Sequence, residues 1–249
     1  MSALTFTLKK TLAQKLDVAG LIPDLLADKS PAEIAATPLP YGKQTLRADE
    51  VFEISGTDSS QLIFENSNAK IDYIGAGLKT GSITINGDAG AFLGFQMKQG
   101  EIVLNGNVGD FLGAALIGDK KGMKGGTVLV SGNTGERTGD QMRRGMILIE
   151  GSAGKYCASR MLAGTIGVLG DVGEYVGYGM RRGTLLLTKK PQMHATLQDC
   201  GTHTLPYLSL MFKSFSGLPS KFAKINQNCV QRYAGDLAND GKGEILVFK

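Results

Sequence analysis

The chain has no tryptophan, only two histidines and only three cysteines, and these shortages exclude several kinds of site. His194 and His203 do not stand at metal-ligand spacing from a cysteine or carboxylate, so no zinc site is predicted. Cys157, Cys200 and Cys229 form no CxxC pair, which argues against a disulfide framework and against an iron–sulfur cluster. No segment reaches the roughly 20 apolar residues of a membrane span, and the N-terminal MSALTFTLKK has no apolar signal core. We therefore expect a cytoplasmic protein.

A strong charge of either sign is lacking as well. The 249 residues carry a net charge of +4, with a sequence pI near 8.9. Such mild basicity permits an acidic partner without requiring a polyanion as extended as a nucleic acid. We expect neither nucleic acid nor a membrane as a partner.

Glycine, by contrast, is abundant and regularly spaced. The chain has 35 glycines, about twice the usual ~7% share, and two series recur every 19 residues with a single step of 26. The regular spacing argues for turns that need positive φ at equivalent places, rather than for a flexible linker. The predicted corner glycines are Gly75, Gly81, Gly94, Gly100, Gly113, Gly126, Gly139, Gly145, Gly164, Gly177 and Gly183, with Ala158 taking one glycine position.

Methionine and short apolar strands follow the same period. Methionines stand at positions 97, 123, 142, 161 and 180, after Leu78, and a strand such as Ile83-Thr84-Ile85 or Ile147-Leu148-Ile149 follows each turn. One short strand cannot bury its apolar face alone, but strands stacked about 4.8 Å apart bury a continuous column of side chains. The pattern predicts an all-β core: a right-handed parallel β-helix, or solenoid, of about 19-residue repeats.

The ends of the chain depart from this pattern, which suggests three parts. Residues 1–46 are expected to form an N-terminal strand and helix segment, residues 47–188 the β-helix, and residues 189–249 a C-terminal tail. Strands are expected at 4–8, a helix start at Ser30, degenerate first coils at 51–54 and 62–64, and a seven-residue insertion around 117–121. The tail is expected to hold a buried helix at 205–215 and a strand–loop–strand at 232–247.

No catalytic constellation is evident in the sequence. Cys200 and His203 could be read as a nucleophile and its base, but a spacing of three residues in a loop is thin support, and a structural role is favoured. The glycine pairs near Gly75 and Gly177 superficially suggest dinucleotide loops, yet they lack the strand-to-helix context that such loops need. We expect no catalytic residue and no metal in this chain.

Cations follow the leucine and methionine positions. The residues concerned are Lys79, Lys98, Lys124, Arg143 and Arg181, with Arg144 and Arg182 next in two of the repeats. Stacked repeats would place them in one column, where like charges repel unless they are solvated or paired. Two interpretations stay open: a solvated edge that prevents aggregation, or a basic stripe that binds an acidic partner surface or a polyanion.

The spacing of glycine, methionine and isoleucine in residues 90–106, repeated in 135–151, resembles the GXGXG β-helical family. That family includes the C-terminal domain of the glutamate synthase large subunit and the C subunit of formylmethanofuran dehydrogenase. The tail, with Asp199-Cys200-Gly201 and the run from Arg232 to Leu246, is similar to the latter.

The resemblance implies a non-catalytic subunit of a larger enzyme complex. One version belongs to a bacterial formyltransferase/hydrolase complex of one-carbon metabolism, which moves a formyl group from tetrahydromethanopterin to a methanofuran analogue and releases formate. The alternatives are the C subunit of an archaeal formylmethanofuran dehydrogenase and a detached glutamate synthase domain. The resemblance also implies about four subunit types, no cofactor in this chain, zinc and the methanofuran analogue on partner subunits, and a polyglutamate tail as a candidate ligand of the basic stripe. General sequence character favours the bacterial complex.

Overall fold

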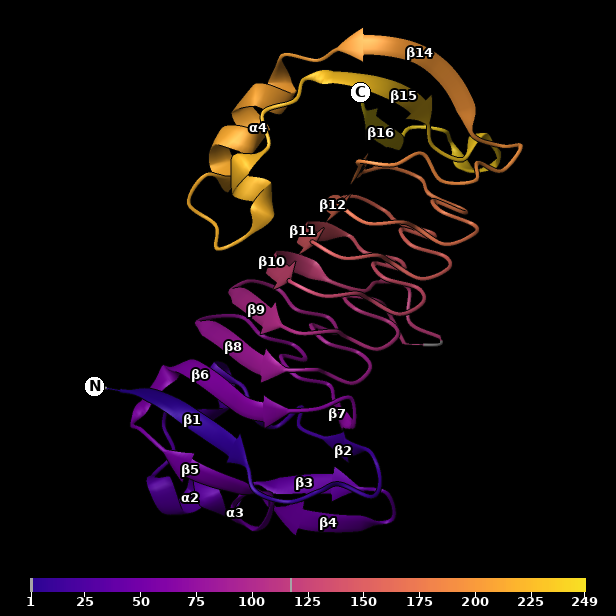
Figure 1. Cartoon of the computed structure of the whole chain (residues 1–249). Helices are drawn as coiled ribbons and strands as arrows, with labels where there is room; N and C mark the ends of the chain where they lie inside the picture. The colour runs from indigo at the N-terminus through magenta and orange to yellow at the C-terminus, as the bar shows by residue number, and fades with distance from the viewer. Residues whose placement is uncertain (1, 117) are drawn as a thin grey trace.

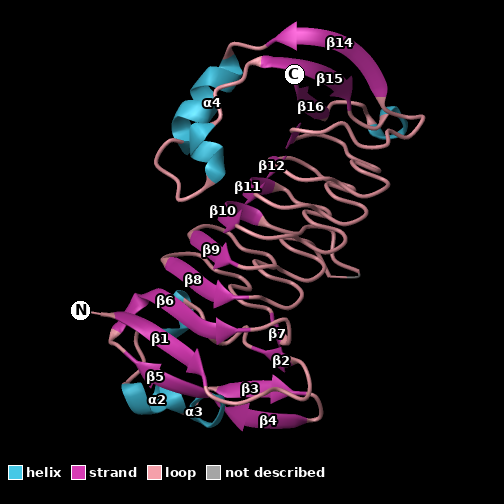
Figure 2. Cartoon of the chain, in the orientation of Figure 1, coloured by secondary structure: helices cyan, strands magenta, loops and turns pink. Residues whose placement is uncertain are grey.

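The computed structural model describes residues 2–116 and 118–249 and is built mostly of β-strands (Figures 1 and 2). The strands are β1 (Ala3–Leu8), β2 (Leu16–Asp17), β3 (Pro38–Tyr41), β4 (Gln44–Arg47), β5 (Phe52–Ser55), β6 (Asp58–Ser67), β7 (Ile71–Asp72), β8 (Ser82–Gly87), β9 (Glu101–Asn105), β10 (Lys124–Val130), β11 (Arg144–Ile149), β12 (Thr165–Val168), β13 (Thr184–Leu187), β14 (Gln198–Thr204), β15 (Cys229–Ala234) and β16 (Glu244–Phe248). The helices are short: α1 (Pro23–Leu26), α2 (Pro31–Ala35), α3 (Ala48–Val51), α4 (Tyr207–Phe215), and the 3-10 turns η1 (Lys221–Lys224) and η2 (Leu237–Asn239).

One large sheet runs the length of the molecule. Its 12 strands lie in the order β14-β15-β16-β13-β12-β11-β10-β9-β8-β6-β1-β5, beside a small sheet β4-β3-β2-β7. All neighbours in the large sheet are parallel, except β5 with β1 at one end and β16, β15 and β14 with one another at the other end. The prediction of a mostly β, largely parallel structure is confirmed.

Strands β8 to β13 lie side by side in chain order, and residues one period apart are partners. Ile83 pairs with Ile102, and Ile102 pairs with Val128 across the 26-residue step, so the insertion leaves the register unchanged. The return loops are linked too, through parallel bridges that join residues 89, 108, 134, 153 and 172. Of the segment predicted to hold the insertion, Ile117 lies outside the described residues.

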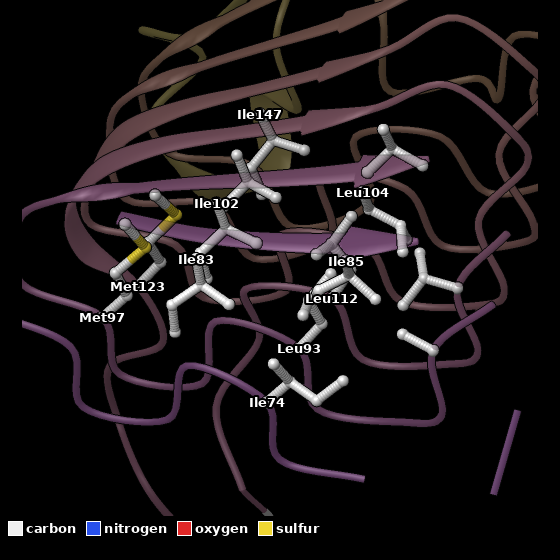
Figure 3. Close-up of a cluster of buried hydrophobic side chains, with 14 of the residues drawn as sticks. Ile74, Ile83, Ile85, Leu93, Met97, Ile102, Leu104, Leu112, Met123 and Ile147 are labelled. Atoms are coloured by element: carbon white, nitrogen blue, oxygen red, sulfur yellow. The ribbon is translucent and has the colours of Figure 1, made fainter. Parts of the chain in front are cut away.

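The interior of the repeat region is a set of apolar columns (Figure 3). Ile83, Ile102 and Ile147 lie in one column, and Met97 and Met123 lie together beside it. All five methionines of the series have no exposed surface. The methyl group of Met123 lies against Gly145, where an added Cβ would come within 2.9 Å of it, and Met142 meets Gly164 in the same way. The first four methionines therefore each pack against the turn glycine of the next repeat, which links the two sequence patterns, and Met180 meets Gly243 of the C-terminal segment instead.

The eleven predicted corner glycines all have positive φ, from 62° at Gly94 to 109° at Gly164. Ala158 adopts the same conformation at φ 59° in spite of its Cβ. A further glycine series behaves differently: Gly106, Gly132, Gly151 and Gly170 do not have positive φ. An added Cβ at Gly151 would instead lie 2.4 Å from the carbonyl oxygen of Gly132, so close stacking of backbones requires glycine there.

The N-terminal segment differs in part from its prediction. The predicted strand at 4–8 lies within β1, and Ser30 caps α2 with a capping box completed by Glu33. Residues 62–64 lie in β6 and join the parallel register as predicted. The prediction of a first coil at 51–54 is wrong, because β5 folds back antiparallel onto β1. Phe52 there packs on Phe6 and Phe64, so aromatic packing in this end segment decides the strand direction.

The C-terminal segment covers the outer face of the sheet and then extends it. Strand β16 pairs in parallel with β13, so Ile245 continues the column that contains Leu185. Helix α4 and η1 form a second apolar core on the outer face, with Phe212 and Phe222 among its members. The predicted helix at 205–215 is therefore present but buried on one face only, since Leu210 is 74% exposed. The strand–loop–strand prediction corresponds to β15, η2 and β16.

Within the described residues, no helix has both the length and the apolar character needed to cross a lipid bilayer.

Candidate functional site

The first predicted cation of each repeat occupies an equivalent backbone position, and these positions stack in one column. Lys98, Lys124, Arg143 and Arg181 each donate their backbone N–H to the carbonyl of the leucine or methionine in the preceding repeat at 2.7–2.9 Å: the acceptors are Leu78, Met97, Met123 and Met161. Leu162 occupies the same position and bonds to Met142 at 2.8 Å. The predicted positions are therefore equivalent in space as well as in sequence.

Four of the seven predicted cations surround one pocket, called here the basic pocket. It has a volume of about 400 Å³ and is lined by Arg143, Arg144, Arg181, Arg182, Leu162, Ala163 and Asp240. All four arginines are exposed, and none forms an ion pair with any residue that the structure describes. The repeat with Leu162 separates the two arginine pairs by two strand spacings, or about 9.6 Å, which is close to the Debye length at 0.1 M salt. This spacing limits their repulsion and leaves room for an anion between them.

One carboxylate reaches the rim of the basic pocket from the C-terminal segment. Asp240 belongs to a turn held by Asp236, whose buried side chain accepts hydrogen bonds from the N–H groups of Gly179 (2.7 Å) and Ala238 (3.0 Å). Burial alone would raise the pKa of Asp236, but these hydrogen bonds outweigh it and lower the pKa. Asp240 is largely exposed and 4.0 Å from Lys242, so it does not neutralise the four arginines.

The three predicted lysines do not join the basic pocket. Lys79 and Lys98 are exposed nearer the N-terminal end, where Asp24 of α1 accepts the N–H of Lys79 at 2.7 Å. The ammonium of Lys124 is directed to Gln96 Oε1 at 3.5 Å and is only partly exposed. The stripe is thus continuous along the backbone, but its charge is concentrated at the four arginines.

The histidines and cysteines show no catalytic arrangement in the described residues. The ring of His203 contacts the carbonyl oxygen of Cys200 at 2.8 Å rather than its thiol, and both residues lie on strand β14, not in the loop that we expected. His194 lies between Thr196 Oγ1 (2.8 Å) and the carbonyl oxygen of Val176 (3.1 Å). No group of three or more histidine, cysteine or carboxylate residues lies close enough to hold a metal, as far as the described residues extend.

Sequence reasoning missed a column of partly exposed aromatic rings. Its members are Tyr73, Phe92, Phe111, Tyr156 and Tyr175, all with φ between 60° and 64°. Adjacent rings stack nearly parallel from Tyr73 to Phe111, and again from Tyr156 to Tyr175, with centroids 4.8–4.9 Å apart. The signal was present, because these residues stand 19 residues apart except where the insertion and Arg137 intervene.

Two curated proteins are similar to part of this chain. The C subunit of the formyltransferase/hydrolase complex Fhc of Methylorubrum extorquens is 37% identical over 86 residues, 34% of this chain. The C subunit of the tungsten-containing formylmethanofuran dehydrogenase 2 of Methanococcus maripaludis is 28% identical over 96 residues, 38% of this chain. These alignments span about a third of each relative, 32% and 35% of their lengths.

A family model and a solved structure extend the similarity. The model described as the GXGXG motif matches residues 71–205. A chain in the X-ray crystal structure of the formyltransferase/hydrolase complex FhcABCD from Methylorubrum extorquens, determined with methylofuran, is 36% identical, with a TM-score of 0.83. The match covers 98% of this chain and 99% of that one. The chain therefore belongs to the GXGXG motif family and is a homologue of the C subunit of the formyltransferase/hydrolase complex.

Proposed function

We propose that this chain is a non-catalytic scaffold subunit of a formyltransferase/hydrolase complex of one-carbon metabolism. The observation that carries the proposal is the near-complete match, at 36% identity, to a chain of FhcABCD. In this proposal the complex transfers a formyl group from tetrahydromethanopterin to a methanofuran analogue and releases formate. The zinc and the methanofuran analogue are bound by partner subunits, while this chain provides surfaces that hold them together.

Co-purification from the source organism tests this proposal. A tagged chain is expected to bring down three other subunit types, including a zinc amidohydrolase, and the purified assembly is expected to release formate from formyl-tetrahydromethanopterin. A deletion of the chain should reduce the amount of assembled complex, because its partners lose a shared surface. Recovery of the tagged chain alone, or with a flavin-containing glutamate synthase, would overturn the proposal.

We also propose that the repeats wind as a right-handed parallel β-helix in the cytoplasm. The unbroken parallel register from β6 to β13 and the linked return loops support this winding. Deletion of the 19 residues 126–144, a whole repeat, should leave a cooperatively folded chain, because every column closes again in register. A 17-residue deletion from the same place should aggregate or unfold. A crystal structure with left-handed connections would contradict the proposal.

The basic pocket is proposed to bind an acidic partner surface or a polyglutamate tail of the methanofuran analogue. Four exposed guanidinium groups without carboxylate partners among the described residues favour an anion with several charges. Replacement of Arg143, Arg144, Arg181 and Arg182 by glutamine should weaken binding of a polyglutamate peptide at least about tenfold and flatten its salt dependence. Replacement of Lys79 and Lys98 by glutamine removes charges from the same column and serves as the control. Unchanged affinity and salt dependence in the arginine variant would discard this site.

The archaeal alternative, the C subunit of a formylmethanofuran dehydrogenase, has support in the 28% identity to the Methanococcus maripaludis protein. It would be favoured if the co-purified assembly contained tungsten or molybdenum and oxidised formylmethanofuran. The 36% identity to the FhcABCD chain favours the formyltransferase/hydrolase complex over it, and over a detached glutamate synthase domain.

A further inference from the structure

The aromatic column is interrupted at one repeat by a cation. Arg137 has the same left-handed backbone conformation, φ 58°, as the rings before and after it. Its guanidinium carbon lies over the ring of Tyr156, 4.6 Å from the ring centroid. A guanidinium that lies over a ring in this way keeps N–H donors in its own plane for another partner.

Arg137 differs from the other cations around it. Lys155 is paired with Glu174 at 2.8 Å, and Arg160 is bound to the buried carboxylate of Asp140 by its Nε at 2.9 Å and by Nη2. Arg137 has no carboxylate partner within the described parts of the chain. One positive charge at this place is therefore left without a partner, while its neighbours are neutralised within the fold.

Two hollows meet at Arg137. One, of about 410 Å³, is lined by Arg137, Tyr156, Ser159, Arg160, Tyr175 and Tyr178. The other, of about 270 Å³, lies on the Phe111 side and shares Arg137 and Arg160 with the first. Tyr175 and Tyr178 are 46% and 52% exposed, so two large rings border an open surface rather than an enclosed cavity.

The combination of exposed tyrosine rings, open hollows and an arginine without a carboxylate partner is typical of protein interfaces. Tyrosine and arginine are enriched at the energetic centres of interfaces, where a ring fills a hollow and a cation pairs as water is excluded. A small molecule would need deeper enclosure, because small-molecule sites bury most of the ligand surface. The stacked rings and the Arg160–Asp140 pair hold the surface in place before a partner arrives, which lowers the entropic cost of binding.

We infer that the surface of Arg137, Tyr156, Tyr175 and Tyr178 is the contact of this chain with a partner subunit that inserts a carboxylate beside an apolar side chain. The carboxylate pairs with Arg137, and the apolar side chain enters the neighbouring hollow that Tyr156, Tyr175 and Tyr178 help to line. This inference rests on the proposed function, because it names the face on which the complex assembles. The face is distinct from the basic pocket, with which it shares no lining residue.

The test measures the affinity that holds the full chain in the purified complex, from the dissociation of the assembly on dilution. Arg137→Gln should weaken this affinity about 30-fold or more, the effect of losing an interface centre. Arg137→Lys should recover only part of the loss, because lysine cannot form the planar double hydrogen bond. Tyr178→Ser should weaken binding about tenfold. Lys213→Gln removes the same charge from an exposed position on α4 and serves as the matched control, with circular dichroism to verify that every variant is folded.

The outcomes separate this inference from the proposed function. If the wild-type chain binds no subunit of the complex, the proposed function fails. If the wild type binds and the folded Arg137→Gln variant binds equally well, only this inference is overturned. A wild-type homodimer that Arg137→Gln dissociates would assign the surface to a second copy of the chain and would likewise overturn the partner-subunit assignment.

Discussion

The two faces of the large sheet differ in how regularly their side chains recur from repeat to repeat. On the inner face every repeat contributes the same kinds of side chain, so Ile83, Ile102 and Ile147 form a column within the repeats themselves. On the outer face the residues differ from strand to strand: Thr84 of β8 is partly exposed, whereas Leu148 of β11 is fully buried. Periodicity therefore accounts for the interior, while single outward residues decide which strands the C-terminal segment covers.

Gly167 shows how specific this outer contact is. In the outward column it follows Leu148 and precedes Leu186, so a leucine would be expected at its position. An added Cβ would lie 2.6 Å from the ring of Phe222, so the missing side chain makes room for that ring. A break in the repeat pattern thus marks a contact made from outside it.

The largest expected effect on stability comes from truncating one buried side chain on each face of the large sheet. Ile147→Ala should lower the free energy of unfolding by about 3 kcal/mol, because it leaves a cavity in a column that continues above and below. Leu148→Ala, one residue along and equally buried, should chiefly release α4 and η1. Hydrogen exchange should then show lost protection in residues 205–225 with the strands unaffected. Equal loss of protection throughout the chain in both variants would mean that the two faces unfold as one unit.

A smaller effect is expected when the outer contact is overfilled. Gly167→Leu should cost about 1–3 kcal/mol, since the new side chain collides with Phe222. Limited proteolysis should cut residues 205–225 faster than in the wild type. The double variant Gly167→Leu, Phe222→Ala should recover part of the resistance. Failure of the second substitution to compensate would contradict the fitted contact.

Glu150 holds the same segment by hydrogen bonds and an ion pair. Its replacement should lower the stability of that contact by about 1 kcal/mol. Its carboxylate accepts hydrogen bonds from Ser220 Oγ (2.9 Å) and Lys221 N (2.7 Å) and pairs with the Lys221 ammonium. Burial acts to raise the pKa of Glu150, but these contacts outweigh it and lower the pKa. The stabilisation is therefore present above the ordinary glutamate pKa of about 4.3 and is lost as the pH falls through the lower, folded value.

Hydrogen exchange measured as a function of pH tests whether this stabilisation is lost at acidic pH. Protection of residues 218–225 in the wild type should fall below about pH 4. Glu150→Gln should show weaker protection at neutral pH and no such acid transition. An acid transition that persists in the glutamine variant would exclude Glu150 as its cause.

The smallest expected effect concerns thiol reactivity. Burial raises the pKa of Cys157 to about 12, so this thiol in the apolar interior of the repeats is neutral at physiological pH. Iodoacetamide should label the partly exposed Cys200 and Cys229 in the native protein. Cys157 should react only after denaturation, which mass spectrometry of the digested protein would detect. Native labelling of Cys157 would show that the inner column opens.

The sequence predicted the parts of the fold in which local pattern and packing agree. Glycine and methionine recur because each repeat meets a copy of itself, so the register from Ile83 to Leu185 could be read from spacing alone. The antiparallel direction of β5 could not be read from spacing, because it depends on the packing of Phe52 against rings from two other strands. The burial of only one face of α4 likewise depends on which outward residues lie opposite it.

The candidate surfaces were predictable to different degrees. The backbone column of cations followed from equivalent positions, but the approach of Asp240 to the four arginines depended on a turn in the C-terminal tail that Asp236 holds. The aromatic column has the same period as the methionines and could have been found from spacing. The lack of a carboxylate partner for Arg137 could not have been predicted from spacing. Asp140 pairs with Arg160 and Glu174 pairs with Lys155 because of the directions of their side chains, which the sequence does not show.

The strand spacing of the large sheet also fixes a distance. From β6 to β16 the sheet advances by seven strand steps, or about 34 Å at 4.8 Å each. A chain that joins two larger proteins through its two ends would hold them apart by a length set by its repeat count, as a rigid spacer does. Adding or removing one repeat would change that separation by one strand step of about 4.8 Å.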